Sequence, residues 1–331
     1  MKTLVTGATG FLGRHLVDAL VARGHDVVAL ARTPDRATFP EGVRAVGGDI
    51  LDPASLAWAV EGCEVVFHCA GVVSRDPADA ELLRRVHVVG TRNVLKASRD
   101  AGARRVVVAS TSGTVAISED ARVSREDDAA PYALLERFPY YRSKLYAEQE
   151  ALRATAPGFD VICVNPSLLL GPGDTLGSST GDVRDFLDGR IPAAPAGGMA
   201  YVDARDAAEA MALAAEKGVA GRRYLVNASN CTVREFFDRL ARLTGLPAPL
   251  LRLPPSRTLA RAGAHLLEAA ARFAGTRPPV DATSVEMAQL FWYCDSTRAT
   301  TELGWTPRDP VATLADTVDD LRGRAAYVTL R

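Results

Sequence analysis

The chain has 331 residues, of which 47% are hydrophobic and 24% charged, and its 39 Lys and Arg residues balance 40 Asp and Glu residues. This balance argues against a nucleic-acid partner, which would require a basic surface, and the hydrophobic content argues against a disordered chain. The length suits one large domain or a domain with a smaller companion.

The five cysteines are far apart in the sequence and include no CxxC pair, which predicts reduced thiols and no metal site. No stretch reaches the roughly 18 uninterrupted apolar residues of a membrane span. The first residues reach glycine before a signal-peptide core could form. We therefore expect a cytoplasmic protein without stable membrane insertion.

Short β-branched runs alternate with helical patterns over the first 165 residues. The first helical pattern places Leu12, Leu16 and Leu20 on one face and ends at Gly24. Strands this apolar are buried on both faces, so the pattern predicts an α/β fold with a doubly wound parallel sheet. The expected strands are 2–6, 26–30, 43–46, 64–68, 104–109 and 160–164, with one more at 222–227.

The pattern changes after Pro166. Residues 170–200 are rich in Gly, Pro, Ser and Asp and predict loops around a short helix near 180–189. A helix at about 204–217 precedes the last strand, and the remainder is mostly helical, with an amphipathic segment at 258–274. We therefore expect a cofactor-binding domain and an interleaved, mostly helical substrate cap. The domain comprises 1–166 joined by about 202–228, and the cap comprises 167–201 and 229–331.

The glycine-rich segment TGATGFLG at 6–13 follows the first strand and opens the first helix. Glycine permits the tight turn and the close approach of a pyrophosphate, which the N–H groups of the helix N-terminus then bind. This order of strand, turn and helix predicts a dinucleotide site. The predicted contacts in this segment are Gly7, Thr9, Gly10, Phe11, Leu12 and Gly13.

The residues after the second strand bear on which dinucleotide binds. NAD sites place a carboxylate there for the ribose hydroxyl, whereas Arg32 occupies this region and the next acidic residue is Asp35. Arg32, with Arg14 and Arg36 adding charge, therefore favours NADP over NAD. The remaining predicted contacts are Asp49 and Ile50 beside the adenine, and Ala70 and Gly71 under the cofactor.

A second motif suggests acid–base chemistry. Tyr140 and Lys144 are four residues apart on a predicted helix and share one face. A phenol has a pKa near 10 in water, and a nearby ammonium together with an oxidised nicotinamide lowers it toward the working range. Tyr141 competes for this role but has no lysine at that spacing. The fifth strand ends in hydroxyl residues at 110–114, of which we expect Ser110 to bond the local turn backbone.

Together these motifs resemble the extended short-chain dehydrogenases/reductases of the NAD-dependent epimerase/dehydratase superfamily. The closest likeness is to the dihydroflavonol 4-reductase and 3β-hydroxysteroid dehydrogenase-like branch, and to hopanoid-associated sugar epimerase-type sequences. The segments that carry the resemblance extend along the chain: TGATGFLG at 6–13, GDILDP at 48–53, FHCAG at 67–71, GTRNVLKA at 90–97, STSGTV at 110–115, YYRSK at 140–144, VNPSLLLGPGD at 164–174 and ELGWTP at 302–307.

The resemblance implies a Rossmann fold and a triad of Ser112, Tyr140 and Lys144. Two positions depart from the family pattern: His87 stands where Asn is usual, and Asp203 where His is usual. If the family's Asn supports a proton relay or a helix bend, either His87 takes over that role or the relay differs in this protein. The other interpretation is that His87 is a core or surface histidine without a functional role. The resemblance also implies three strand-end residues beside the nicotinamide: Asn165, Pro166 and Ser167.

By this resemblance, the protein is an NADPH-dependent reductase. Hydride passes to the carbonyl carbon of a small, mostly apolar ketone, or returns from the alcohol; Ser112 holds the oxygen, Tyr140 protonates it and Lys144 binds the ribose hydroxyls. A homodimer is also implied. One alternative is a sugar epimerase or dehydratase that retains NAD, against which stand Arg32 and the lack of a basic residue at 196–200. The other is a non-catalytic NADP-sensing protein, which would be expected to lose the tyrosine or the lysine.

Overall fold

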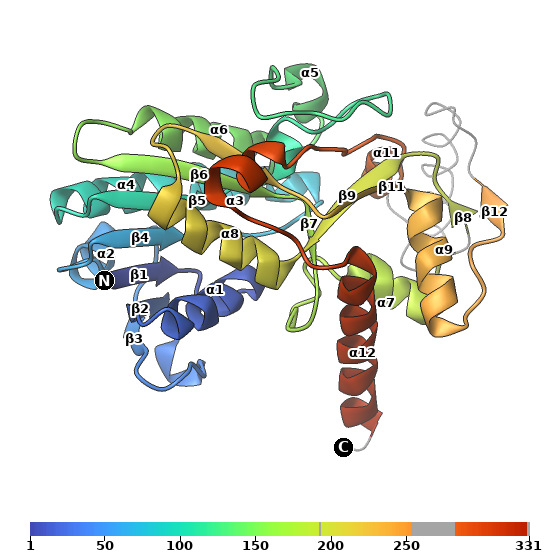
Figure 1. Ribbon diagram of the computed structural model, residues 1–331, viewed down its shortest axis with the longest axis horizontal. Helices are drawn as coiled ribbons and strands as arrows, with labels where there is room; N and C mark the ends of the chain where they lie inside the picture. Colours follow the sequence, from blue (N-terminus) through green and yellow to red (C-terminus); the bar gives the residue numbers. More distant parts are fainter. Residues whose placement is uncertain (192, 253–281, 330–331) are drawn as a thin grey trace.

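A seven-stranded parallel sheet forms the centre of the protein (Figure 1). The computed structural model describes residues 1–191, 193–252 and 282–329. All pairings in this sheet are parallel, which confirms the predicted doubly wound fold. From one edge to the other, the strands are β3 (Arg44–Gly47), β2 (Asp26–Ala31), β1 (Lys2–Thr6), β4 (Val65–His68), β5 (Arg105–Ala109), β6 (Asp160–Pro166) and β10 (Arg223–Val226).

Helices cover both faces of this sheet, as Figure 1 shows. Because successive side chains of a strand point to opposite faces, neighbouring residues enter different cores. On β5, Val107 packs in the cluster that contains α1 and α8, whereas Val106 packs in the cluster on the other face. The helices are α1 (Phe11–Ala22) and α8 (Ala204–Lys217) on the first face, and α2 (Pro53–Ala59), α4 (Gly90–Asp100) and α6 (Pro139–Arg153) on the second.

The strand order of the central sheet reverses at β1. The chain proceeds outward from β1 to β3 and then returns to β4 on the other side of β1. Ligands of open α/β sheets bind where the order reverses in this way. The helix between β1 and β2 ends as predicted, since Gly24 adopts a positive φ of 72° directly after the last turn.

The region after β6 contains more strand than we expected. Instead of loops alone around α7 (Gly181–Leu187), three short strands form a second sheet, and two more make a small pair. Each strand is short and pairs with a segment distant in sequence, so local patterns could not reveal it. The strands are β7 (Leu168–Leu170), β9 (Gly198–Asp203) and β11 (Ser229–Thr232), and the pair is β8 (Ala193–Ala194) with β12 (Leu251–Arg252).

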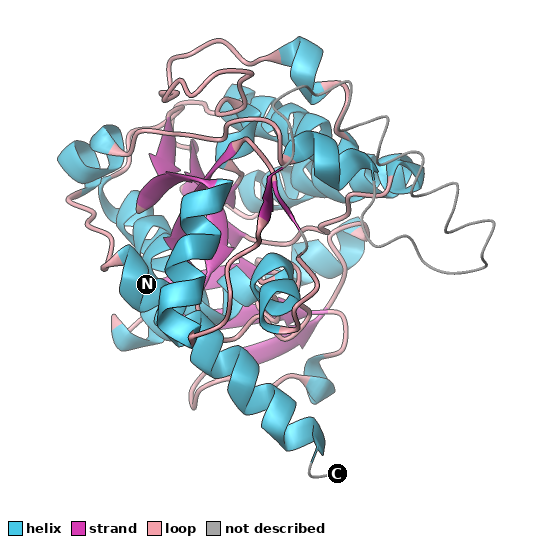
Figure 2. Cartoon of the chain, turned by 90° about the vertical axis from the view of Figure 1, so that its right-hand side faces the viewer, coloured by secondary structure: helices cyan, strands magenta, loops and turns pink. Residues whose placement is uncertain are grey.

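Helices account for much of the remaining described chain, and Figure 2 shows them surrounding the strands. None of the described helices is long and apolar enough to cross a bilayer. The amphipathic segment predicted at 258–274 lies outside the described residues. The remaining helices are α3 (Ala80–Arg84), α5 (Tyr132–Leu135), α9 (Val233–Thr244), α11 (Ala282–Met287) and α12 (Pro310–Thr329).

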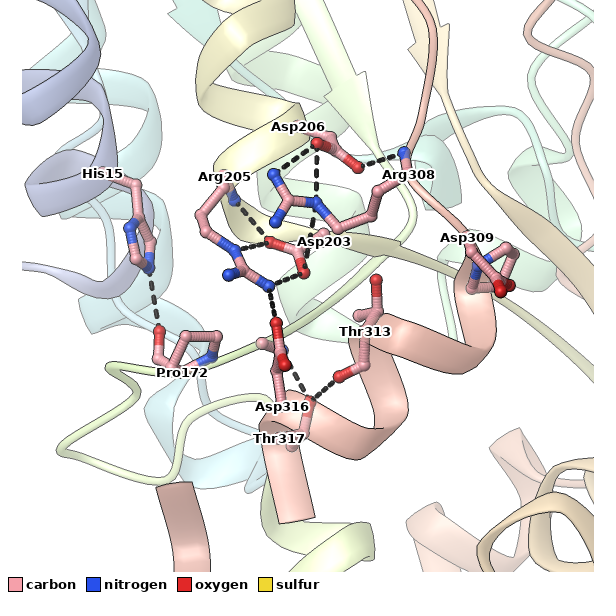
Figure 3. A network of polar contacts seen from close by, with 12 residues as sticks. His15, Pro172, Asp203, Arg205, Asp206, Arg308, Asp309, Thr313, Asp316 and Thr317 are labelled. Atoms are coloured by element: carbon pink, nitrogen blue, oxygen red, sulfur yellow. Dashed lines mark hydrogen bonds and ion pairs between the residues drawn. The ribbon is translucent and has the colours of Figure 1, made fainter. Parts of the chain in front are cut away.

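An ion-pair network centred on the buried Asp203 fastens α12 to the start of α8 (Figure 3). Asp203 is fully buried, caps α8 and pairs with the guanidinium groups of Arg205 at 2.7 Å and Arg308 at 3.6 Å. Arg205 also reaches Asp316 of α12 at 2.5 Å. Although burial raises the pKa of Asp203, hydrogen bonds from Arg205 hold it below its usual value. Asp203, at the position where the resemblance implied histidine, therefore anchors α12 to α8 through Arg205.

Candidate active site

The predicted dinucleotide motif forms the turn between β1 and α1. Gly7 has a positive φ of 69°, and a Cβ there would lie 2.5 Å from the backbone nitrogen of Ala70. At Gly13 a Cβ would lie 2.1 Å from the carbonyl oxygen of Gly7. The N-cap residue Gly10 makes no side-chain cap, so the first N–H groups of α1 are open to an anion. This cradle fits the pyrophosphate of a dinucleotide. Thr9 is exposed, and Phe11 and Leu12 are half-buried.

The residues predicted to bind the adenosine end lie after β2 and β3. Arg32 is exposed directly past β2, and no ion pair within the described chain engages its guanidinium. The nearest following carboxylate, Asp35, lies in a short helical turn and is also exposed. Asp49 accepts the N–H of Leu51 at 2.9 Å, and the neighbouring Ile50 is buried. A free cation and no carboxylate therefore occupy the end of β2.

Helix α6 brings the two predicted proton-transfer residues to the end of β5. Lys144 donates a hydrogen bond from Nζ to the carbonyl oxygen of Ala109, the last residue of β5, at 2.7 Å. Tyr140 lies one turn earlier on the same helix and is half-buried. Burial and the adjacent Tyr141 raise the pKa of Tyr140, while burial lowers the pKa of Lys144. The phenol and the ammonium therefore share a desolvated environment beside the sheet edge.

The three hydroxyl residues after β5 have different partners. Ser112 is only 4% exposed, and its hydroxyl lies beside the buried thiol of Cys294. Thr111 is half-buried and accepts a backbone N–H two residues further along, at 3.3 Å. Ser110 donates to the carboxylate of Glu148, so its predicted role in the local turn is wrong. The turn bond belongs to Thr111, because α6 brings an acceptor over Ser110 from 38 residues away.

A buried carboxylate lies one helical turn beyond Lys144. Glu148 accepts hydrogen bonds from Thr114 at 3.1 Å and from the amide nitrogen of Asn165 at 2.5 Å, and pairs with Arg223 at 3.0 Å. Asn165, predicted beside the nicotinamide, thus directs its amide nitrogen into this network, and its Oδ1 atom is buried without a hydrogen-bond partner. The other two residues predicted there, Pro166 and Ser167, follow directly and are buried.

The unusual histidine lies against α6, the helix that carries Tyr140 and Lys144. His87 is at the centre of a π-helical turn (Arg85–Val89), a local widening frequent at functional sites. Its Nδ1 atom is 2.8 Å from the hydroxyl of Ser143, and its ring meets the Tyr140 ring edge to face, with centroids 5.6 Å apart. Burial, followed by the charge of Lys144, lowers the pKa of His87 to about 2. The histidine is therefore a neutral, buried group in contact with the candidate site.

An aromatic cluster that the sequence did not reveal adjoins Tyr140. The ring of Tyr141 lies 5.0 Å from that of Tyr140 and 4.7 Å from that of Trp292. Gly113 makes this possible, because a Cβ there would lie 2.4 Å from the Tyr141 ring. Tyr141 and Trp292 are both half-buried and pack at the edge of an apolar cluster that contains Phe138. The site thus has an apolar wall beside its phenol.

Within residues 1–191, 193–252 and 282–329, no group of three or more His, Cys, Asp or Glu side chains could hold an ion. The cysteines in these ranges are all free.

Comparisons with known proteins agree with this geometry. The NAD dependent epimerase/dehydratase family matches residues 3–227. The chain is 36% identical to sterol demethylase protein B of Methylococcus capsulatus, over 98% of this chain and 99% of that protein. It is 34% identical to the 4-hydroxy-2-methyl-3-oxo-4-farnesyl-3,4-dihydroquinoline-1-oxide ketoreductase of Stigmatella aurantiaca, over 81% and 80%.

Among solved structures, gox2253 shares 30% identity with this chain and superposes with a TM-score of 0.83, covering 97% of this chain and 98% of that one. The fold is therefore common to proteins that match this chain over nearly its full length. The protein belongs to the NAD-dependent epimerase/dehydratase family, within the extended short-chain dehydrogenases/reductases, and is an NAD(P)-dependent oxidoreductase.

Proposed function

We propose that this protein is an NADPH-dependent reductase of a small, mostly apolar ketone, and that Ser112, Tyr140 and Lys144 form its catalytic triad. The observation that carries this proposal is the placement of Tyr140 and Lys144 on one face of α6, with Lys144 hydrogen-bonded to the end of β5. This edge of the sheet also holds the glycine cradle. A bound nicotinamide would supply the hydride in one direction and accept it in the other.

Each triad residue has a distinct task in this reaction. The phenol of Tyr140 donates its proton to the carbonyl oxygen as charge develops there. Burial raises the pKa of Tyr140, and the proposed task of the Lys144 ammonium, one turn along α6, is to stabilise the phenolate that remains. The hydroxyl of Ser112, which lies beside Cys294, donates to the same carbonyl oxygen and orients it toward Tyr140.

NADPH is the proposed cofactor because of the charge at the end of β2. Arg32 is exposed there without an ion-pair partner in the described chain, and its planar guanidinium can bind a ribose phosphate with two hydrogen bonds. Asn165, Pro166 and Ser167 are proposed to border the nicotinamide, at the end of β6.

The proposed substrate is apolar because of the wall beside Tyr140. The half-buried rings of Tyr141 and Trp292 offer flat, apolar surface next to the phenol that would protonate the carbonyl. We propose that residues 167–201 and 229–331 form the substrate cap over this wall. The ketoreductase relative, whose name includes a 3-oxo-dihydroquinoline, supports a ring-bearing ketone.

The test measures NADPH oxidation by absorbance over a panel of ketones, with Tyr140→Phe as the variant. We expect the wild type to oxidise NADPH with ring-bearing ketones and Tyr140→Phe to be at least 10²-fold slower in kcat, since it loses the proton donor. Tyr141→Phe is the matched control, because it removes the neighbouring hydroxyl and keeps the aromatic wall. Equal rates for the wild type and Tyr140→Phe would refute the proposal.

The same purified protein distinguishes the reductase from the two alternative functions. Tightly retained NAD⁺, released on denaturation, together with conversion of a sugar nucleotide, would favour an epimerase or dehydratase over the reductase. Wild type that binds NADPH but oxidises none of it across the panel would favour a sensing protein. We also propose a cytoplasmic homodimer; light scattering of the purified protein tests the dimer and fractionation of cells tests the compartment.

A further inference from the structure

His87 lies between two segments that meet at the candidate site. On one side is the stretch that leaves β4, where Val72 donates its backbone N–H to Nε2 of His87 at 3.2 Å. On the other side is α6, where Ser143 meets Nδ1 of the same ring at 2.8 Å. The first segment is the predicted floor of the cofactor site, and the second carries Tyr140. A single side chain therefore spans the cofactor side and the proton-donor side.

The hydrogen bonds around this ring have only one arrangement. A backbone N–H can only donate, so Nε2 of His87 must be the acceptor for Val72. In a neutral imidazole the other nitrogen then carries the hydrogen, and Nδ1–H donates to the hydroxyl of Ser143. That hydroxyl in turn donates to the backbone carbonyl of Tyr140 at 2.7 Å. Three hydrogen bonds thus extend in one direction from the segment after β4 to the catalytic tyrosine.

The surroundings favour the neutral ring. The groups that face His87 are Lys144 and Tyr140 of α6 and His68 of β4, which contribute a positive charge and no negative one. A Cβ at Gly71 would lie 3.2 Å from Nε2, so the backbone at the end of this segment lies directly on the ring. Protonation of Nε2 would replace the bond to Val72 with a clash of two donors.

We propose that His87 is a positioning residue that joins the Gly71–Val72 segment to the catalytic helix, and so sets the distance between the nicotinamide and the phenol of Tyr140. It passes no proton itself. The rigid His87 ring bridges the two segments, because one of its nitrogens bonds Val72 and the other bonds Ser143. This inference rests on the proposed reductase function.

Two substitutions separate the two ends of the ring. The amide of His87→Asn can occupy the place of Nδ1 and serve Ser143, whereas that of His87→Gln can occupy the place of Nε2 and serve Val72. We expect His87→Asn to weaken NADPH binding about tenfold while kcat falls little, because the floor segment loses its anchor. We expect His87→Gln to lower kcat about tenfold with NADPH affinity unchanged, because α6 loses its anchor.

Two further variants remove the hydrogen bonds of His87 in other ways. Ser143→Ala removes the bond to Nδ1 and should reproduce the kcat loss of His87→Gln. His87→Phe keeps the ring but neither hydrogen bond and should show both defects; if it does not fold, the Asn and Gln pair carries the test. A general loss of stability would move kcat and NADPH affinity together in all variants and would overturn the proposal.

The pH profile separates positioning from proton transfer. We expect kcat of the wild type, His87→Asn and His87→Gln to share the same dependence on pH between 5 and 8. An inflection in the wild type that both substitutions abolish would make His87 the proton donor and overturn the proposal. Fluorescence titration with NADPH needs no substrate. It therefore still compares the NADPH affinities of His87→Asn and His87→Gln if the wild type does not reduce ketones. That outcome would refute the proposed function separately.

Discussion

Glu148 and Arg223 form an ion pair of 3.0 Å in which the carboxylate is completely buried. The pair joins α6 to β10 and lies one helical turn beyond Lys144. Since an ion pair of this kind repays its desolvation only while both partners are present, it makes the removal of either one costly. Strand β10 is thereby locked to α6, the helix that carries Tyr140 and Lys144.

Removing the carboxylate should therefore destabilise the protein. We expect Glu148→Ala to lower the free energy of unfolding by about 3 kcal/mol, because it leaves the Arg223 charge unpaired and several hydrogen-bond donors unsatisfied. Urea unfolding followed by circular dichroism measures the loss. The double variant Glu148→Ala/Arg223→Met should lose less than the sum of its two single variants, because neither charge remains alone. Additive losses would show that the pair is not energetically coupled.

Two buried histidines should make the protein sensitive to mild acid. Burial, followed by the charge of Lys144, lowers the pKa of His68 to about 3, and burial lowers that of His87 to about 2. In the unfolded chain both have values near about 6.5, so below that pH only the unfolded state takes up their protons. The free energy of unfolding is therefore constant above pH ~6.5 with respect to these groups and falls as the pH decreases toward ~3.

The slope of the free energy of unfolding against pH, measured with and without His87, gives the contribution of each histidine. Each histidine contributes a slope of about 1.4 kcal/mol per pH unit within that window. Urea unfolding at pH 7, 6 and 5 measures the combined slope, and His87→Gln should reduce it by the share of one proton. A free energy that stays flat between pH 7 and 5 would mean that the folded protein can protonate both rings.

Local spacing predicted the parts of the site that lie within one element. Gly7 and Gly13 belong to one turn, and Tyr140 and Lys144 to one helix, so periodicity and residue type sufficed to select them. The strands of the central sheet were likewise found because each is an apolar run buried on both faces. Their observed bounds differ from the expected ones by only a residue or two at most ends.

Contacts between distant segments could not be predicted in this way. Tyr141 meets Trp292 across 151 residues. Val72 meets His87 across 15 residues that include α3 and the start of the π-helical turn. No local pattern encodes either pairing. The strands β7 and β9 escaped notice for the same reason: their pairing is with each other and with β11, and their flanking glycines and prolines indicate loops. Residue types were visible in the sequence, but their partners were not.

Arg32 should determine the choice of cofactor. We expect Arg32→Gln to raise KM for NADPH about 10- to 100-fold, because a charge-assisted contact with the ribose phosphate is lost, and to leave KM for NADH nearly unchanged. Initial rates with each cofactor, at a fixed ketone concentration and in low salt, measure the ratio. Arg36→Gln, which removes a neighbouring exposed arginine that we expect only to add charge, should have a smaller effect on KM for NADPH. If Arg32→Gln alters both cofactors equally, the residue does not recognise the phosphate.

The hydroxyl that binds the carbonyl oxygen can be identified by comparing two neighbours. Ser112 is buried beside Cys294, whereas Thr111 is half-buried and its hydroxyl accepts a backbone N–H of the turn. Under the proposed triad, Ser112→Ala should lower kcat about 10²–10³-fold, since it removes a donor to the developing charge, while Thr111→Val should retain most activity. Single-turnover rates with NADPH separate this effect from product release. The reverse result, with Thr111→Val inactive and Ser112→Ala active, would assign the carbonyl contact to Thr111 and leave Ser112 as a buried neighbour of Cys294.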